Sequence, residues 1–360
     1  MRQFKGVSVL DYIPIETANG DISRELFVRD YLIPNKPVLI KGGISHWPAV
    51  EKWNFDFFDS EYGDLEVPLG GIGNDILERR TFREYLANFD QYDDRDLEDL
   101  FNRQDVRYLR AFLTLNEDPE QDLRKRILKD LGDDWGLPQF MPQTLYMTPA
   151  VLENWEPSQL GVSRDDMGIG MFFSPKGAIT ELHQDCCQSD GFLSQIEGRK
   201  RAFLMSPDQS ALVEDALKGR DPSDHGAFPQ PRFGNAHTAF VADLEPGDLL
   251  YIPSLWIHEV YTLSRSISVC IHCIHALKAK YILDLGAKVT EHLSVCYLSD
   301  IAFGEGLLRI SKALPIVEQI AEDRFQPELS SYGIDNPARL RDELLQGGQA
   351  MAQLLGTAPA

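Results

Sequence analysis

The chain has 360 residues, 43% of them hydrophobic, and carries 56 acidic against 35 basic side chains, a formal net charge of −21. A chain of this length can bury one large core with an appended segment. No stretch approaches the roughly 20 apolar residues that a membrane span needs, and so acidic a chain repels a phosphate backbone. We therefore expect neither a membrane nor a nucleic acid as partner, whereas the acidic surface either serves solubility or attracts a cationic substrate.

Residues 1 to about 150 are predicted to form a strand and helices that flank a larger domain. Helical segments are expected at residues 22–32, which precede two helix-breaking prolines, at 82–89 and at 119–131. Acidic residues concentrate at 90–98 and 117–134 with basic residues among them, as on a solvated helical surface.

Residues about 151 to 275 hold short apolar runs separated by glycine and proline. The runs lie at 168–173, 192–196, 199–205, 249–252 and 267–271. This pattern is typical of antiparallel strands in a barrel or jelly roll, so the fold class is predicted to be mainly β with helices. The segment Cys270-x-His272-Cys273-x-His275 is either a zinc cluster or a strand with small buried cysteines. Its alternation within an apolar run favours the strand.

The tail, residues 276–360, is predicted to be helical. Apolar residues recur near one helical face in three stretches, 277–296, 307–320 and 340–355. Three such stripes exceed what an isolated tail can bury on itself, which favours a two-fold homodimer interface. In the alternative, the helices pack back on the barrel. Five cysteines, an odd number, predict no disulfide framework, and with no apolar signal region after the N-terminus they favour a cytoplasmic location.

His183, Asp185 and His258 form a candidate metal-ligand set. Two histidines and one carboxylate can hold ferrous iron on one face of an octahedron and leave the other positions open. Residues i and i+2 of a strand point the same way, so His183 and Asp185 can reach one metal while the third ligand comes from elsewhere. A His-x-Asp pair alone occurs by chance in many chains, and its strand-like surroundings are what make this one informative.

Several stretches in the same order resemble the cupin-type, JmjC-like oxygenases that use Fe(II), 2-oxoglutarate and O2, and among these the asparaginyl-hydroxylase-type subgroup and its bacterial relatives. They are residues 35–42 with 47–49 and Trp53, then 180–185, 195–201, 246–253 and 256–258. The resemblance covers about residues 30–275. It implies a double-stranded β-helix (cupin jelly-roll) core within a catalytic domain at 1–275, with flanking elements at 1–150 and the metal-binding barrel at 151–275. It also implies dimerisation through a C-terminal helical region at 276–360.

The resemblance assigns roles to six residues. His183, Asp185 and His258 would bind the iron, and Lys200, Thr180 and Tyr108 would bind the distal carboxylate of 2-oxoglutarate. A buried dicarboxylate needs a cation and several donors, because an unpaired buried carboxylate is costly. Considered apart from the family resemblance, Lys200 would be interpreted as a solvated residue at a strand end, and Tyr108 as a core-packing residue.

The chain departs from the asparaginyl-hydroxylase pattern beside the metal ligands. Gly191 and Cys270 stand near two positions at which the subgroup has asparagine, and the loop after Asp185 is about two residues longer. Residues of this kind surround a metal centre and tune it. The same loop places three candidate substrate-lining residues next to Asp185, with small buried side chains as the alternative interpretation: Cys186, Cys187 and Gln188.

The expected activity is hydroxylation of a peptide or protein side chain, or demethylation through hydroxylation, because an intact Asp185 fills the position that a halide would need. Hydroxylation of a small metabolite is the first alternative. A non-catalytic cupin-fold binding protein is another alternative, disfavoured because the metal ligands and co-substrate residues are all retained. A cupin dioxygenase or isomerase without co-substrate is the last, and Lys200 in its motif argues against it.

Overall fold

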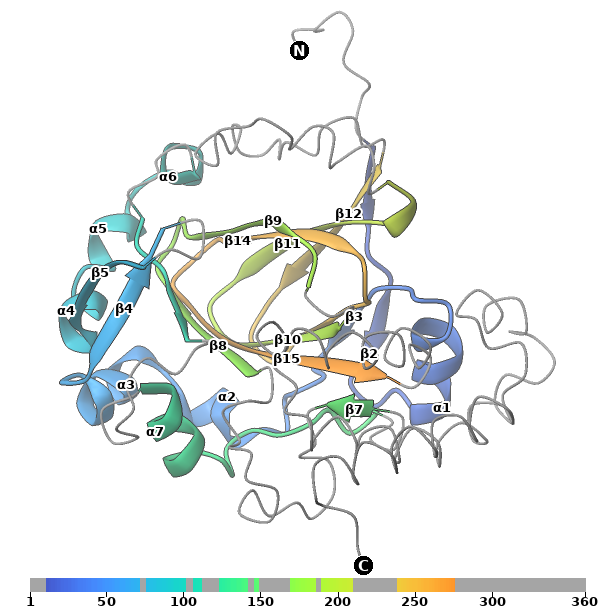
Figure 1. Ribbon diagram of the computed structural model, residues 1–360, viewed down its shortest axis with the longest axis horizontal. Coiled ribbons are helices and arrows are strands. Elements are labelled where there is room, and N and C mark those ends of the chain that lie inside the picture. Colours follow the sequence, from blue (N-terminus) through green and yellow to red (C-terminus); the bar gives the residue numbers. More distant parts are fainter. Residues whose placement is uncertain are drawn as a thin grey trace, which may run out of the picture.

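The computed structural model describes residues 11–71, 76–101, 106–111, 123–141, 146–148, 169–185, 189–209 and 238–275. Two sheets face one another across a central space, with helices outside them (Figure 1). The five-stranded sheet has the order β1-β12-β11-β14-β9, and the eight-stranded sheet has the order β2-β3-β13-β10-β15-β8-β6 with β7 as an eighth strand off this path. A two-stranded sheet, β4-β5, lies beside them, and β7 pairs with β15.

The strands are β1 (Asp11–Pro14), β2 (Thr17–Asn19), β3 (Val38–Lys41), β4 (Glu66–Gly70), β5 (Ile76–Thr81), β6 (Leu109–Ala111), β7 (Tyr146–Thr148), β8 (Ile169–Ser174), β9 (Ile179–His183), β10 (Asp190–Glu197), β11 (Lys200–Met205), β12 (Thr238–Leu244), β13 (Leu249–Ile252), β14 (Ile257–Thr262) and β15 (Ser266–His275). The helices are α1 (Arg24–Phe27), α2 (Pro48–Lys52), α3 (Phe55–Tyr62), α4 (Phe82–Leu86), α5 (Asp90–Asp93), α6 (Leu97–Phe101) and α7 (Leu123–Asp130), with a π-helical turn at Val28–Leu32 and a 3-10 turn at Pro207–Gln209. Among these described helices, none is long and apolar enough to cross a membrane.

Eight strands, β8 to β15, form the core of the fold. Along the chain they pass back and forth between the two sheets: β8, β10, β13 and β15 lie in one, and β9, β11, β12 and β14 lie in the other. The pairings among them are antiparallel. This arrangement is a double-stranded β-helix, so the predicted jelly-roll core is confirmed.

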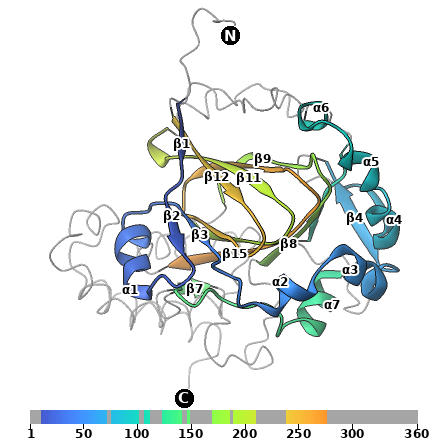
Figure 2. The ribbon, with the colours of Figure 1, turned by 180° about the vertical axis from the view of Figure 1, so that it is seen from behind.

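The N-terminal region does more than flank this core, because its strands extend both sheets. β1 adds to the edge of the five-stranded sheet in parallel with β12, and β3 pairs with β13 in the other sheet (Figure 2). β6 pairs with β8, and a bridge from Gly70 to Tyr108 connects β4 to the same end. Backbone hydrogen bonds therefore tie residues 11–111 to the barrel on several sides.

The predicted N-terminal helices are present within a few residues of their expected bounds. α1 and its π-helical extension cover residues 24–32, α4 covers 82–86 and α7 covers 123–130. The Ser23 side chain caps α1 by accepting a hydrogen bond from the backbone N–H of Leu26, at 3.2 Å. Thr81 and Glu84 form a reciprocal capping box at the start of α4. The predicted helical tail at 276–360 lies outside the described residues.

Alternation along the strands separates the barrel interior from its outer faces. Phe172 and Leu204 belong to a buried cluster between the two sheets. Their neighbours point the other way: Phe173 packs on Phe58 of α3, with ring centroids 4.8 Å apart, and Phe203 lies on the outer face of the five-stranded sheet. The eight-stranded sheet is thus covered by buried apolar residues on both faces.

Glu197, at the end of β10, gives the fold a testable pH dependence. Burial, opposed by Arg265, raises the pKa of Glu197 from 4.5 to about 7. Because the folded state holds this proton more tightly than the unfolded state, the contribution to stability is present at low pH and is lost as the pH rises through about 7. We expect Glu197→Gln to increase the free energy of unfolding at pH 8 by about 1–2 kcal/mol, allowing for partial solvent access, and much less at pH 5. Urea denaturation at both pH values measures this, and an equal gain at both would contradict it.

Candidate metal centre

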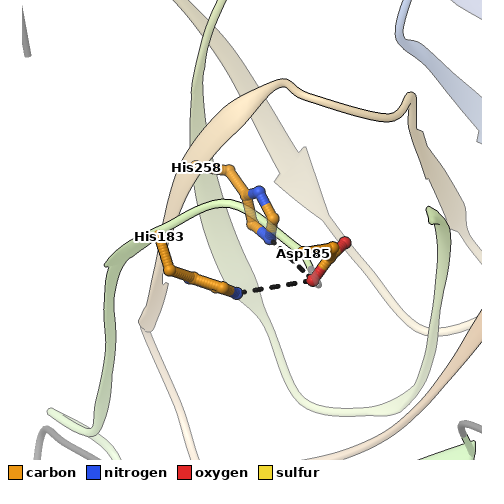
Figure 3. A group of neighbouring side chains, drawn as sticks. All are labelled: His183, Asp185 and His258. Carbon is orange, nitrogen blue, oxygen red and sulfur yellow. Dashed lines mark ion pairs between the residues drawn. The ribbon is translucent and has the colours of Figure 1, made fainter. Parts of the chain in front are cut away.

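Three side chains predicted to bind metal converge inside the barrel. The Nε2 atoms of His183 and His258 lie 3.6 and 3.9 Å from Oδ1 of Asp185. Within the part of the chain that the structure describes, one ligand atom from each of the three lies within 4.8 Å of the others. Figure 3 shows both imidazole rings directed at the carboxylate.

The two histidines come from neighbouring strands, and their alignment follows from strand pairing. His183 on β9 is directly opposite His258 on β14. β9 ends at His183, however, so Asp185 lies in the coil just after the strand. The prediction placed both His183 and Asp185 on a strand; Asp185 instead lies just beyond the end of β9, and its carboxylate still lies close to both rings.

A bulge in β9 explains how Thr180 and His183, three residues apart, both face inward. Thr180 pairs with Val260 and His183 pairs with His258, so β9 holds one more residue than β14 between the two pairs. An odd separation in a regular strand would send the two side chains to opposite faces, and one extra residue restores a common face. The bulge therefore places Thr180 on the same face of β9 as His183.

Backbone carbonyls set the orientation of both rings. Nδ1 of His183 lies 2.7 Å from the carbonyl oxygen of Glu181, and Nδ1 of His258 lies 3.0 Å from that of Trp256. When each Nδ1 donates its hydrogen to the carbonyl, each Nε2 presents a lone pair toward Asp185. This is the tautomer that a metal-binding imidazole needs, so the residues fit a metal ion.

The charge state of the cluster also suits a divalent cation. Burial alone would raise the pKa of Asp185, but the facing imidazoles of His272, His258 and His183 hold it well below its usual range. Burial, reinforced by His183, lowers the pKa of His258 to about 4. Burial would also lower the pKa of His183, but the hydrogen bond and charge of Asp185 raise it, so a metal that binds at low pH must displace a proton from this ring. An ionised carboxylate beside a neutral imidazole is a donor set for iron and similar transition metals.

A second polar group surrounds Lys200, which is only 1% exposed on β11. Its Nζ donates to Oγ of Ser268 at 2.7 Å and lies 3.3 Å from the hydroxyl of Tyr108. Thr180 contacts the same hydroxyl at 3.5 Å. The structure thus brings together the three predicted co-substrate residues. The solvated strand end, the alternative for Lys200, is wrong.

Two basic side chains, Lys200 and Arg110, approach Tyr108 in this group. The hydrogen-bond partners of Lys200 among the described residues are the hydroxyls of Ser268 and Tyr108, and the guanidinium of Arg110 lies over the ring of Tyr108, 4.3 Å from its centroid. Burial would raise the pKa of Tyr108, but Lys200 and Arg110 lower it. A buried ammonium without a carboxylate is unfavourable unless an anion completes the site. An anionic ligand beside Lys200 would provide such a counter-charge.

The cupin-like domain family matches residues 23–273. The chain belongs to this family. The predicted relationship to cupin-type, JmjC-like oxygenases is confirmed for the family. The match does not single out the asparaginyl-hydroxylase subgroup.

Three relatives of this cupin-like protein illustrate the family. Lysine-specific demethylase 8 of Xenopus tropicalis is 28% identical over 287 residues, 74% of this chain and 56% of the relative. The 2-oxoglutarate and iron-dependent oxygenase JMJD4 of Gallus gallus is 26% identical over 269 residues, 68% of this chain and 56% of the relative. The tRNA wybutosine-synthesizing protein 5 of Danio rerio is 27% identical over 281 residues, 75% of this chain and 77% of the relative. The chain thus spans little more than half of the first two. The predicted cofactors, Fe(II), 2-oxoglutarate and O2, agree with the name of the second and with the ligand geometry.

Two residues of the cupin-like site were missed in the sequence, Ser268 and His272 on β15. Together with Cys270 they occupy alternate positions of this strand, so all three share the face that lines the barrel. Polar residues at every second position of an apolar run were the available signal. The strand interpretation of residues 270–275 is confirmed, but His272 is also a neighbour of Asp185. Cys186, Cys187 and Gln188 lie outside the described residues.

Proposed function

We propose that the protein is an Fe(II)- and 2-oxoglutarate-dependent oxygenase. The observation that carries the proposal is the pairing of two sites inside one barrel: a His-Asp-His cluster and, across the bulge of β9, a buried lysine that lacks a carboxylate partner among the described residues. A metal alone would explain the first site, and an anion alone would explain the second. A keto acid that reaches both explains their proximity.

In the proposed mechanism, His183, Asp185 and His258 hold the iron, and Lys200, Thr180, Tyr108 and Ser268 bind the distal carboxylate of 2-oxoglutarate. When bound, the iron and co-substrate supply the oxidation: one oxygen atom of O2 goes to the substrate and the other to succinate, with release of CO2.

The chain's own residues provide orientation and exclusion of water. The carbonyls of Glu181 and Trp256 orient the imidazoles of His183 and His258. The ring centroid of Phe172 lies 5.1 Å from Nζ of Lys200, and this ring shields the ammonium group from water. A charge-assisted hydrogen bond is strongest in such a dry setting.

A protein side chain is the proposed substrate, and hydroxylation is the proposed outcome, with demethylation through hydroxylation as the related reaction. The names of two relatives, lysine-specific demethylase 8 and tRNA wybutosine-synthesizing protein 5, refer to an amino acid of proteins and to tRNA. The net charge of −21 favours a cationic peptide over tRNA. A small metabolite is the second candidate. A binding protein without activity is disfavoured by the convergence of all three ligands.

Two features of the proposal rest on sequence alone. We propose a homodimer that assembles through the apolar stripes of residues 276–360, and a cytoplasmic location. Light scattering on the full chain and on a chain truncated after about residue 280 tests the first. A full-length monomer at micromolar concentration would contradict it.

Substrate-free turnover is the decisive test of the activity. The purified protein with Fe(II) should convert 2-oxoglutarate slowly to succinate, and addition of cell extract should yield proteins with a gain of one oxygen atom, detected by mass spectrometry. The proposal fails if the iron-loaded protein neither binds 2-oxoglutarate nor releases succinate.

A further inference from the structure

A third imidazole approaches the carboxylate of the metal site. Nδ1 of His272 lies 3.5 Å from Oδ1 of Asp185, the same oxygen that Nε2 of His183 and Nε2 of His258 approach. His183 and His258 come from the five-stranded sheet, whereas His272 comes from β15 at the centre of the eight-stranded sheet. Asp185 therefore lies between imidazoles that belong to both walls of the barrel.

The other carboxylate oxygen faces a glycine that is paired with His272. Gly191 on β10 is opposite His272 on β15. A Cβ atom at Gly191 would lie 3.2 Å from Oδ2 of Asp185, closer than side-chain atoms usually approach, and 3.7 Å from Sγ of Cys270. Because Gly191 has no side chain, Oδ2 of Asp185 has room beside it, while His272 contacts Oδ1. One pair of strands confines both oxygens of the ligand.

We propose that His272 is a positioning residue that donates a hydrogen bond from Nδ1 to the Asp185 carboxylate and fixes its orientation for metal binding. This inference rests on the proposed function, since it assigns a role at the same metal centre. Groups that hydrogen-bond a ligating carboxylate hold it in place and raise metal affinity, and their loss commonly costs 10–100-fold.

Two other roles for His272 make different predictions. As a fourth metal ligand it would join the cluster of mutually close ligand atoms, but among the described residues that cluster contains His183, Asp185 and His258 only. As a core residue it would contribute to stability alone. Its side chain is 19% exposed, which makes a purely structural role weaker than that of fully buried neighbours such as Ile271.

Three substitutions separate these roles. Asparagine places an amide nitrogen where Nδ1 of histidine lies, glutamine places one near Nε2, and alanine places none. Titration of the full chain with Co²⁺, followed by visible absorption, reports affinity and coordination without turnover. The melting temperature of the metal-free protein reports stability. His183→Ala removes a proposed ligand as a positive control, and His46→Ala removes an exposed histidine as a negative control.

We expect His272→Ala and His272→Gln to weaken Co²⁺ binding about 10–100-fold, His272→Asn to remain within about threefold of the native protein, and all three to melt within a few degrees of it. The shape of the Co²⁺ absorption bands should not change. Unaltered affinity in His272→Ala, or a loss in His272→Asn equal to that in His272→Ala, overturns the inference. The inference is also overturned if the Co²⁺ absorption bands of His272→Ala change in the way expected when a metal ligand is lost. If His183→Ala binds Co²⁺ normally, the metal centre itself is wrong; if only His183→Ala fails, the proposed function stands without this role for His272.

Discussion

His258→Ala should abolish iron binding and all turnover of 2-oxoglutarate while the fold persists. His258 is 4% exposed, and the carbonyl of Trp256 orients its ring toward Asp185, so alanine removes a preorganised ligand. The loss should exceed the 10–100-fold that removal of an outer partner costs, because one of only three protein ligands disappears. Anaerobic reconstitution with Fe(II) and elemental analysis give the stoichiometry, and succinate release gives the activity.

The control for this prediction is the metal-free protein. Truncation of a buried histidine leaves a small cavity, so the melting temperature of metal-free His258→Ala should fall modestly, whereas the stabilisation that added metal gives the native protein should vanish. His46→Ala, at an exposed position, should behave like the native protein in every assay. Normal iron content in His258→Ala would show that the ligand set is wrong.

The sequence predicted the ligand set because its spacing and surroundings are local. His183 and Asp185 are two residues apart, and His258 follows a strand signal that glycine and proline delimit. The route by which Asp185 reaches the metal was not predictable in the same way. β9 ends at His183 and does not continue to Asp185. Its end depends on pairing with β14, which is distant in the sequence and leaves no local pattern.

Residues from the far wall of the barrel were harder still to predict. Ser268 reaches Lys200, and His272 reaches Asp185, only because β15 lies between β10 and β8 with a particular register. A one-residue shift of β15 would turn both side chains outward. The same holds for β1, because its parallel pairing with β12, more than 220 residues later in the chain, leaves no local signal in Asp-Tyr-Ile-Pro.

Lys200→Met should weaken 2-oxoglutarate binding by about 1.5–3 kcal/mol, or roughly 10–150-fold, with iron retained. Methionine has nearly the length of lysine and fills the same space beside Phe172, but it removes the charge that the distal carboxylate would meet. It also removes the cost of a buried ammonium whose described partners are the hydroxyls of Ser268 and Tyr108. The metal-free, co-substrate-free variant should therefore be as stable as the native protein or more so.

A matched lysine makes the Lys200→Met prediction specific. Lys176, in the turn between β8 and β9, donates to the backbone carbonyls of Asp93 and Arg95 at 2.8 and 2.6 Å, outside the pocket. Lys176→Met should lower stability and leave 2-oxoglutarate affinity unchanged, the reverse of the pattern for Lys200→Met. Calorimetric titration of both iron-loaded variants, with thermal unfolding of both unliganded forms, measures the two pairs of values. Equal co-substrate affinities for the two variants would show that 2-oxoglutarate does not contact Lys200. The Lys200 ammonium would then be a structural group that needs no anionic ligand.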